Sequence, residues 1–269
     1  MQRGLNEYLE MKRLYFSRFF FLSNDEMLEI LSETKDPKRV QPHLGKCFEG
    51  IGKLVFEEDK RISGMVSGEG ETVTFGGEHI VPTAMVEQWL LQVEEQMFMS
   101  MRRVCAEGAE AYGDGGNRAQ WVLEWQGQVV LAVTLMKWTS GVHEALAAGG
   151  AAALRDYYTR CSSELDDIVK LVRGDLTKLA RKVLSPLIVM DVHARDVVDA
   201  MAKAGVDSET DFNWLSQLRY YDSADEGIRV RMISTELPYG YEYMGVQGRL
   251  VVTPLTDRCY RTLMGALQL

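Results

Sequence analysis

The residue types that most often carry out chemistry are concentrated at positions 191–196, Asp-Val-His-Ala-Arg-Asp. A histidine beside two carboxylates could bind a metal ion or transfer protons. On a helix, however, residues two positions apart point in different directions, so these side chains do not converge on one point. We expect Asp191 and Arg195 to pair four residues apart on one helix face, or a polar contact between helices, rather than a catalytic or metal site.

Other motifs of enzyme active sites are absent from the sequence. It has no G-x-x-x-x-G-K-S/T phosphate loop, no G-x-G-x-x-G after a strand, no G-x-S-x-G turn and no H-E-x-x-H pair. The acidic runs 57–59 and 164–167 are typical of solvated faces. Trp121, Trp125 and Trp138 could stack a ligand, but their helical spacing favours a place in the core or along a groove. The sequence predicts no catalytic residue and no metal ligand.

Composition narrows the classes of partner. The chain has 269 residues and a formal net charge of −9, which disfavours nucleic acid and acidic membranes as partners. Its four cysteines form no C-x-x-C pair, which is typical of free thiols in a reducing compartment. No run approaches the roughly 20 apolar residues that cross a bilayer, and the amphipathic start lacks a signal core. We expect a soluble protein made in the cytoplasm.

The elements that position these residues begin with short helices and a hairpin. Ser23 and Glu26 have the spacing of a capping box, and Asp36-Pro37 opens a further helical piece. Residues 61–75 alternate with period two around a glycine turn, which predicts a β-hairpin that ends at the Gly76-Gly77 pair.

The middle of the chain predicts long helices. An apolar stripe runs from Met85 to Val104, and a glycine-rich break follows at 113–116. Residues 118–147 could form one helix of about 45 Å. After a turn at Gly149-Gly150, two more helices are expected over 154–172 and 176–204, the second kinked at Pro186. Short loops between such helices favour antiparallel packing in an elongated helical bundle.

The last third changes character. Residues 212–221 predict a short helix, 228–233 predict a strand, and 250–253 predict another strand that leads into a helix start at Thr256. This order is typical of the entry to an α/β unit. The predicted fold is therefore mainly α: an elongated helical bundle with a small β-hairpin and a short C-terminal α/β segment.

Seven stretches carry a resemblance to a known family. They are residues 8–13 (YLEMKR), 18–32 (RFFFLSNDEMLEILS), 40–44 (VQPHL), 191–197 (DVHARDV), 212–221 (FNWLSQLRYY), 240–243 (GYEY) and 249–258 (RLVVTPLTDR). They resemble the linker region of dynein heavy chains and, at the end, the segment that leads into the first AAA+ module. Residues 19–26 and 41–51 are similar to the axonemal branch. The motifs keep the family's order over essentially the whole chain.

The resemblance implies three parts: a linker helical subdomain with a β-hairpin (1–82), the long-helix bundle of the linker (83–205), and the linker end with an incomplete entry to the first AAA+ module (206–269). It also implies a partial adenine pocket, not functional alone, formed by Leu250, Val251, Thr253, Pro254 and Leu255. The family's phosphate loop comes later in the chain. We therefore expect an excised fragment that is not an enzyme and holds no cofactor, with ATP and Mg²⁺ bound by the parent chain.

The function implied is mechanical. The linker of the family is a lever that couples ATP-driven changes in the AAA+ ring to force production on microtubules in the axoneme of cilia and flagella. The implied partner is the AAA+ ring of the same heavy chain, with intermediate and light chains engaged indirectly and no direct microtubule binding. Two alternatives stay open: a helical scaffold that recruits accessory or regulatory chains, and a free-standing nucleotide-binding enzyme with an atypical site.

Overall fold

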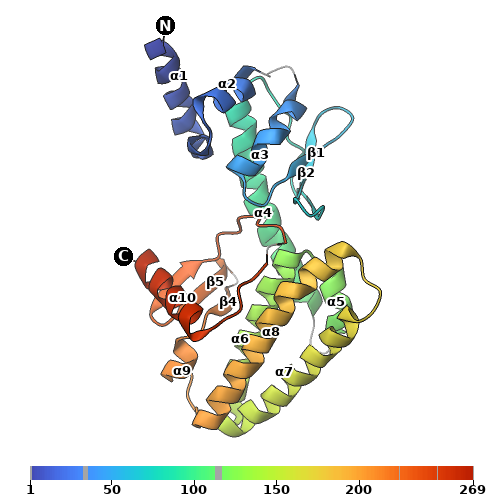
Figure 1. Cartoon of the computed structure of the whole chain (residues 1–269), viewed down its shortest axis with the longest axis vertical. Helices are drawn as coiled ribbons and strands as arrows, with labels where there is room; N and C mark the ends of the chain where they lie inside the picture. Colours follow the sequence, from blue (N-terminus) through green and yellow to red (C-terminus); the bar gives the residue numbers. More distant parts are fainter. Residues whose placement is uncertain (1, 33–35, 113–116, 224, 247, 269) are drawn as a thin grey trace. The chain divides into compact units, whose positions relative to one another are not determined.

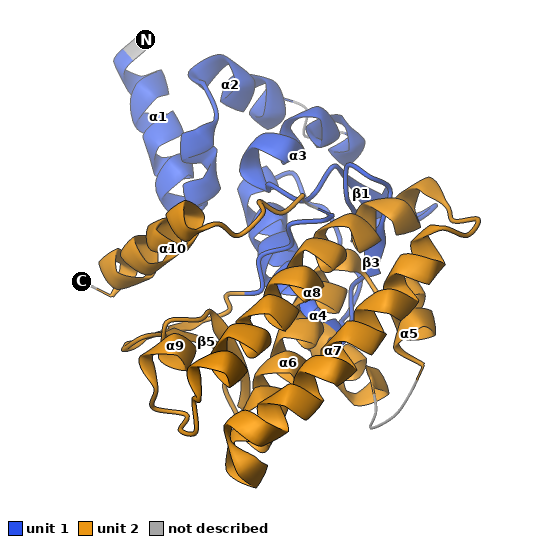
Figure 2. Ribbon diagram, turned by 60° about the horizontal axis from the view of Figure 1, so that its bottom comes forward, with its two compact units in different colours: residues 1–104, 241–246 blue, residues 105–240, 247–269 orange. Residues whose placement is uncertain are grey.

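The computed structural model describes residues 2–32, 36–112, 117–223, 225–246 and 248–268. These residues form mainly α-helices with two small three-stranded antiparallel sheets (Figure 1), which confirms the predicted fold class. The predicted glycine break at 113–116 lies outside the described residues. The chain divides into two compact units (Figure 2): unit 1 is Met1–Val104 with Tyr241–Val246, and unit 2 is Cys105–Gly240 with Gln247–Leu269.

Unit 1 begins with short helices, continues with a sheet and ends with the first part of a long helix. Its elements are α1 (Gln2–Tyr15), the 3-10 helix η1 (Ser17–Phe21), α2 (Asn24–Ser32), the 3-10 helix η2 (Pro37–Val40), α3 (Gln41–Cys47), β1 (Lys53–Phe56), β2 (Ile62–Val66), β3 (Thr72–Thr74) and α4 (Val86–Tyr112), which continues into unit 2.

The predicted helix starts of unit 1 are confirmed. The Ser23 hydroxyl accepts from the Glu26 backbone N–H at 3.3 Å, while the Glu26 carboxylate accepts from the Ser23 N–H at 3.0 Å. This reciprocal capping box satisfies backbone donors that the first helical turn leaves without partners. The Asp36 carboxylate caps η2 in the same way, accepting from the Lys38 N–H at 3.3 Å.

The sheet of unit 1 contains one strand more than the sequence predicts. The expected hairpin is present as β2 and β3, where Met65 lies opposite Val73. On the other side β2 pairs with β1, where Leu54 lies opposite Met65. β1 escaped prediction because its four residues bury one side chain, Leu54, and so give almost no periodic signal.

The stripe predicted on α4 forms the core beneath this sheet. Its members from Val86 onward are buried, namely Val86, Trp89, Leu90, Val93, Met97, Met101 and Val104. Met85, placed at the head of this stripe, instead precedes the helix and is exposed.

Unit 2 contains a helical bundle, a second sheet and a terminal helix. After the end of α4, its elements are α5 (Arg118–Glu124), α6 (Gly127–Gly149), α7 (Ala151–Val172), α8 (Lys178–Ala204), α9 (Phe212–Leu215), β4 (Arg219–Ser223), β5 (Gly227–Met232), β6 (Thr235–Pro238) and α10 (Pro254–Leu267).

The prediction of a single helix over 118–147 is wrong, because the helix is interrupted between α5 and α6. Trp125 and Gln126 both have extended backbone conformations. Trp125 stacks against Trp121, with ring centroids 6.5 Å apart, and the Trp121 indole N–H donates to the Gly108 carbonyl at 3.1 Å. These contacts fix α5 against the end of α4, and Gly127, a poor helix former, then starts α6.

α6, α7 and α8 pack side by side as the body of unit 2 (Figure 1). α6 is buried around most of its circumference, as expected for a central helix. The core joins α6 to α8 and α9 through Trp138, Met190, Met201 and Trp214. The predicted turn at Gly149-Gly150 is confirmed, and Pro186 lies buried inside a continuous α8.

The C-terminal third differs from the prediction in two places. The helix expected over 212–221 ends at Leu215, because residues from Arg219 onward pair with β5, Tyr220 lying opposite Val230. The strand predicted over 228–233 is confirmed as β5, and β6 adds an unpredicted third strand. The strand predicted over 250–253 is wrong: residues 248–253 have no regular structure and no strand partner among the described residues.

Candidate functional site

The five residues predicted to form part of a pocket are mostly exposed to solvent. Leu250 and Val251 lie in the irregular segment that precedes α10, with 69% and 65% of their surface exposed, and Leu255 at the start of α10 is 72% exposed. A strand is stable only with a hydrogen-bonded neighbour, and the second sheet ends at β6 without pairing with this segment. Of these three side chains, Leu250 lines the small cavity described below.

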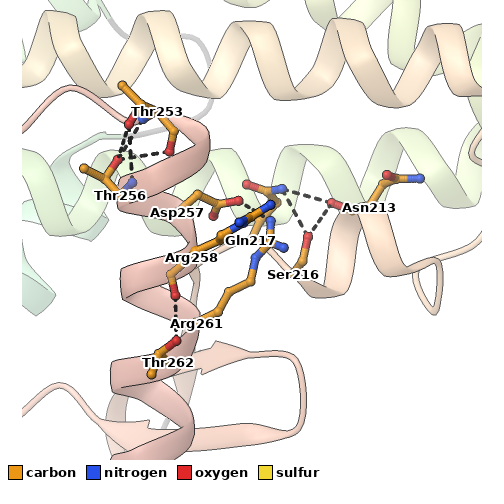
Figure 3. A network of polar contacts seen from close by, with 9 residues as sticks. All are labelled: Asn213, Ser216, Gln217, Thr253, Thr256, Asp257, Arg258, Arg261 and Thr262. Atoms are coloured by element: carbon orange, nitrogen blue, oxygen red, sulfur yellow. Dashed lines mark hydrogen bonds and ion pairs between the residues drawn. The ribbon is translucent and has the colours of Figure 1, made fainter.

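Thr253 and Pro254 start α10 rather than line a cavity. The Thr253 backbone N–H donates to the Thr256 hydroxyl at 2.7 Å, and the Thr253 hydroxyl accepts from the Thr256 backbone N–H at 3.3 Å (Figure 3). Pro254 occupies the first helical position, where its missing N–H costs nothing. The expected helix is confirmed, and it begins at Pro254, two residues before Thr256.

Polar side chains connect the first turns of α10 with the chain that follows α9. Arg261 forms an ion pair with Asp257 one turn earlier and lies over the Phe212 ring at 5.9 Å. In Figure 3, Asp257 and Arg261 lie beside Gln217, whose amide donates to the Asn213 carbonyl at 3.1 Å. The contact of Arg261 with the Phe212 ring thus joins α10 to α9.

A small cavity lies beneath the segment 249–252. It measures about 50 Å³ and is lined by residues of α6, α8 and α10 together with Leu250 and Val252. Sites for small organic molecules usually measure about 300–1,000 Å³, so this cavity does not accommodate a nucleotide. The Trp138 indole N–H, at the wall of this cavity, has no hydrogen-bond partner among the described residues.

His193 also lines this cavity. Burial lowers the pKa of its imidazole, a nearby Arg249 lowers it further, and Asp257 opposes both effects. His193 is thus held in the neutral form near pH 7, and Arg249 donates instead to the Met190 sulfur at 2.7 Å. The histidine of the 191–196 cluster faces the segment 249–252 rather than a metal.

Asp191, the first residue of that cluster, forms a contact between helices. Its carboxylate accepts two hydrogen bonds from Arg118 of α5, at 2.8 and 2.9 Å, and both side chains are about nine-tenths buried. The predicted pairing with Arg195 is wrong, since Arg195 pairs with its neighbour Asp196. The alternative of a polar contact between helices is confirmed. Arg118 lies 73 residues away in the sequence, so no spacing signal could have identified it.

Burial dominates the electrostatics of this pair. It raises the pKa of the Asp191 carboxyl, while the Arg118 guanidinium counteracts that effect. For Arg118, burial alone would lower the pKa, but the Asp191 carboxylate more than compensates and the pKa is raised. A bidentate pair of this kind fixes the angle between two helices.

The remaining residues that the sequence analysis considered have structural roles. Trp121 and Trp138 are buried, as their helical spacing predicts, and Trp125 packs on Trp121. Within the acidic runs, Glu164 pairs with Arg160 and Asp167 with Lys170 on the exposed side of α7.

Three further features bear on the kind of site. Across the described ranges, no group of three or more His, Cys, Asp or Glu side chains could hold a metal ion. All four cysteines are unpaired thiols. No helix in the part of the chain that the structure describes is long and apolar enough to span a membrane.

Two family models match the chain, and together they cover five of the seven stretches that carry the resemblance. Residues 1–108 match "Dynein heavy chain, N-terminal region 2". Residues 239–269 match "Hydrolytic ATP binding site of dynein motor region". The second match covers Leu250, Val251, Thr253, Pro254 and Leu255.

Curated relatives align over the whole chain. Mouse dynein axonemal heavy chain 3 is 56% identical over 272 residues, human dynein axonemal heavy chain 12 is 54% identical over 273, and mouse dynein axonemal heavy chain 1 is 51% identical over 269. Each alignment covers 100% of this chain but 6%, 9% and 6% of the relative, respectively.

The chain belongs to the dynein heavy-chain family. Within that family it is of the axonemal type, as the motifs at 19–26 and 41–51 predicted. It carries a linker-region match at its start and the beginning of an ATP-site match at its end, and it spans less than a tenth of the length of these relatives.

Proposed function

We propose that this chain is the C-terminal part of an axonemal dynein linker joined to the first elements of the first AAA+ module. In this role it acts as a lever that couples ATP-driven changes in the AAA+ ring to force on microtubules. The observation that carries the proposal is the presence, in one chain, of the linker-region match and the ATP-site match in the family's order. We propose the three-part division at 1–82, 83–205 and 206–269 on the same ground.

The packing within unit 2 is suited to carrying load. α6, α7 and α8 contain 23, 22 and 27 residues, so each is about 33–40 Å long at 1.5 Å per residue. The buried Arg118–Asp191 pair ties α5 to α8 across the end of this bundle. Helices packed along their length deform less than single helices, which favours transmission of force.

We propose that the 269 residues by themselves do not hydrolyse ATP. Nucleotide binding in AAA+ modules depends on a phosphate loop and Mg²⁺, which we assign to the parent chain. The five candidate pocket residues Leu250, Val251, Thr253, Pro254 and Leu255 would contribute apolar contact with the adenine only when the rest of the module covers them. Isothermal titration of Mg-ATP into the isolated chain tests this, and a micromolar dissociation constant would contradict it.

We place the parent motor in the axoneme of a cilium or flagellum after synthesis in the cytoplasm. Its main partner is the AAA+ ring of the same heavy chain, and intermediate and light chains act indirectly. The net charge of −9 argues against direct contact with the acidic microtubule surface, nucleic acid or acidic membranes. The isolated chain is expected to stay in the supernatant when microtubules are sedimented at low salt.

The lever role is tested in the whole heavy chain with a matched pair of variants. Asp191→Asn removes the charge that holds α5 to α8, and Asp196→Asn removes an exposed charge paired only with its neighbour. For a lever, Asp191→Asn slows microtubule gliding several-fold more than it slows microtubule-stimulated ATP hydrolysis, while Asp196→Asn changes neither. Equal losses of gliding and hydrolysis in Asp191→Asn would assign this region to the ATPase cycle instead.

A second candidate function is a scaffold that recruits accessory or regulatory chains. The observation that favours it is an exposed apolar face near the N-terminus, formed by Met11 and Leu14 of α1 and Phe21 of η1. Capture of axonemal proteins by the isolated chain, lost in a Met11→Ser, Leu14→Ser variant, would support the scaffold.

A further inference from the structure

The segment Tyr241–Val246 belongs to unit 1, although 136 residues of unit 2 separate it from the rest of that unit. Buried and half-buried residues alternate from Tyr241 to Gly245, and Tyr241, Tyr243 and Val246 are buried. Polar contacts fix this segment as well as apolar ones, and they come from two separate parts of unit 1.

Tyr243 occupies the centre of the segment and is fully buried. Its hydroxyl donates to the Glu71 carboxylate at 2.8 Å, next to β3. Burial, together with the adjacent Glu71 carboxylate, raises the pKa of the Tyr243 phenol, so that it remains a hydrogen-bond donor throughout the neutral range. A buried carboxylate that accepts from a buried hydroxyl is costly to separate, because both groups would lose a partner away from water.

The adjacent Glu242 is held by an arginine from the N-terminal helices. Arg18 donates to both Glu242 carboxylate oxygens, at 2.8 and 2.6 Å, and also to the Cys47 carbonyl at 3.0 Å. The guanidinium lies over the Phe48 ring at 4.7 Å and pairs with Glu94 of α4. The planar guanidinium of Arg18 thus contacts α4, the end of α3 and the segment Tyr241–Val246 at the same time.

The backbone of the segment also fits closely. A Cβ at Gly50 would collide with the Tyr243 carbonyl oxygen, so only glycine allows the segment to lie there. Gly245 has a φ of +63°, and a Cβ on it would lie 2.9 Å from the Ser67 side chain. Unit 1 thus forms a dedicated site whose occupant is the Tyr-Glu-Tyr sequence 241–243 of its own chain.

The path of the chain gives this site a mechanical meaning. The polypeptide crosses between the units three times: within α4 after Val104, before Tyr241 and after Val246. Two of these crossings flank the bound segment. If the segment left its site, the two crossings beside it would no longer be anchored to unit 1. The crossing within α4 would then be the remaining anchored connection between the units.

We propose that Tyr241–Val246 is a clasp that fastens unit 1 to the stretch leading into α10. It provides a second path, besides α4, by which displacement of residues 248–268 reaches unit 1. This deepens the lever proposal above and rests on it for its role in the motor, but the clasp itself is a property of this chain without nucleotide.

Amide hydrogen exchange of the whole chain tests the clasp. The amides of 241–246 are expected to exchange at least about a hundredfold more slowly than those of 248–253. Tyr243→Phe is expected to speed exchange in 241–246 about tenfold, and Glu242→Gln is expected to do so to a smaller extent. Tyr239→Phe is the matched control: it removes a tyrosine hydroxyl that accepts from Gln128 in unit 2, and it should leave 241–246 unchanged. Equal exchange of the two segments in the unaltered chain would overturn the proposal.

Distance measurement tests the connection. Spin labels at Asp25→Cys in unit 1 and Ala148→Cys in unit 2 are introduced with Cys259→Ser, since Cys47, Cys105 and Cys161 have pKa values raised to about 12 by burial and react poorly. Glu242→Ala is expected to broaden the distribution of label distances. Fast exchange in 241–246 without broadening would show that the clasp carries no load. A clasp confirmed here together with failure of the gliding test would reject the lever and keep the clasp.

Discussion

Two neighbouring stretches at the end of the chain are held in opposite ways. Tyr241–Val246 is surrounded by unit 1, and Tyr243 within it has no exposed surface. Pro254–Leu267, which forms α10, has no buried residue along its entire length. Both stretches contain apolar and aromatic side chains, so composition does not explain the difference.

The difference lies in what the rest of the chain supplies to each stretch. Unit 1 offers a glycine, a carboxylate and an arginine at matching positions along 241–246. α10 receives a contact from the Phe212 ring on Arg261, while Leu255 and Leu263 face solvent. The extent of burial therefore distinguishes Tyr241–Val246, which unit 1 surrounds, from α10, which other residues of a motor would cover in the proposed function.

The largest effect is expected at the closest backbone approach. Gly50→Val should destabilise the chain by about 3 kcal/mol, because the new side chain collides with the Tyr243 backbone. Urea unfolding monitored by tryptophan fluorescence measures this. Gly45→Ala in α3 is the matched control: no atom lies within 4 Å of the new Cβ, so stability should stay the same or rise by about 0.5–1 kcal/mol. Equal losses in both variants would show that unit 1 does not depend on the clasp.

A smaller effect is expected from the charge that anchors the clasp. Glu242→Gln should cost about 1–2 kcal/mol, because Arg18 loses a bidentate partner in a mostly buried position. Glu7→Gln removes an exposed partner of Arg3 in the same unit and should cost less than about 0.5 kcal/mol. A chemical-denaturation series at two salt concentrations compares them, and a strong salt dependence of the Glu242 effect would contradict its partial burial.

Acidification should loosen 248–252 before it affects 241–246. The folded-state pKa of His193 lies below the ordinary value of 6.5, so its contribution is complete above about pH 6.5 and is lost as the pH falls through the folded-state pKa. Protonation would place a second positive charge beside Arg249. The protection of the amides of 248–252, which is their exchange rate relative to the intrinsic rate at the same pH, should be lower at pH 5.5 than at pH 7.5, and His193→Asn should remove most of that difference. Faster exchange confined to 241–246 would contradict this assignment.

The smallest effect is expected on α10. Leu255→Ser should change the free energy of unfolding by less than about 0.5 kcal/mol, because this side chain is mostly exposed. Leu154→Ser in α7, where the leucine is fully buried, should cost more than about 2 kcal/mol. Thermal unfolding of the two variants measures the contrast, and a large loss in Leu255→Ser would mean that α10 packs more tightly than its exposure indicates.

Local signals predicted most of the helices. The capping box at Ser23, the stripe from Val86 to Val104 and the turn at Gly150 depend on residues a few positions apart, and all three are confirmed. Strand content was harder to predict. β1 and β6 each have four residues, and a strand is stabilised by its neighbour more than by its own sequence. The aromatic run after Leu215 resembles a helix until its pairing with β5 is known.

The candidate site was less predictable, because its contacts span long distances in the sequence. The motifs lead to the right family, but for Asp191 they leave open a pair with Arg195 or a contact between helices, and only the fold identifies the partner as Arg118 of α5. The contacts of Arg18 with Glu242 and of Glu71 with Tyr243 join residues 224 and 172 positions apart. No periodicity reports such pairs, which arise only when the fold brings the elements together.

The position of Tyr241–Val246 in unit 1 has a consequence for biosynthesis. A growing polypeptide leaves the ribosome at about 5–20 residues per second, so the 136 residues between the two parts of unit 1 take roughly 7 to 27 seconds to appear. During that interval the surface bordered by Gly50, Arg18 and Glu71 is not yet covered by the segment Tyr241–Val246. Unit 1 would therefore be complete only well after residues 1–104 have emerged.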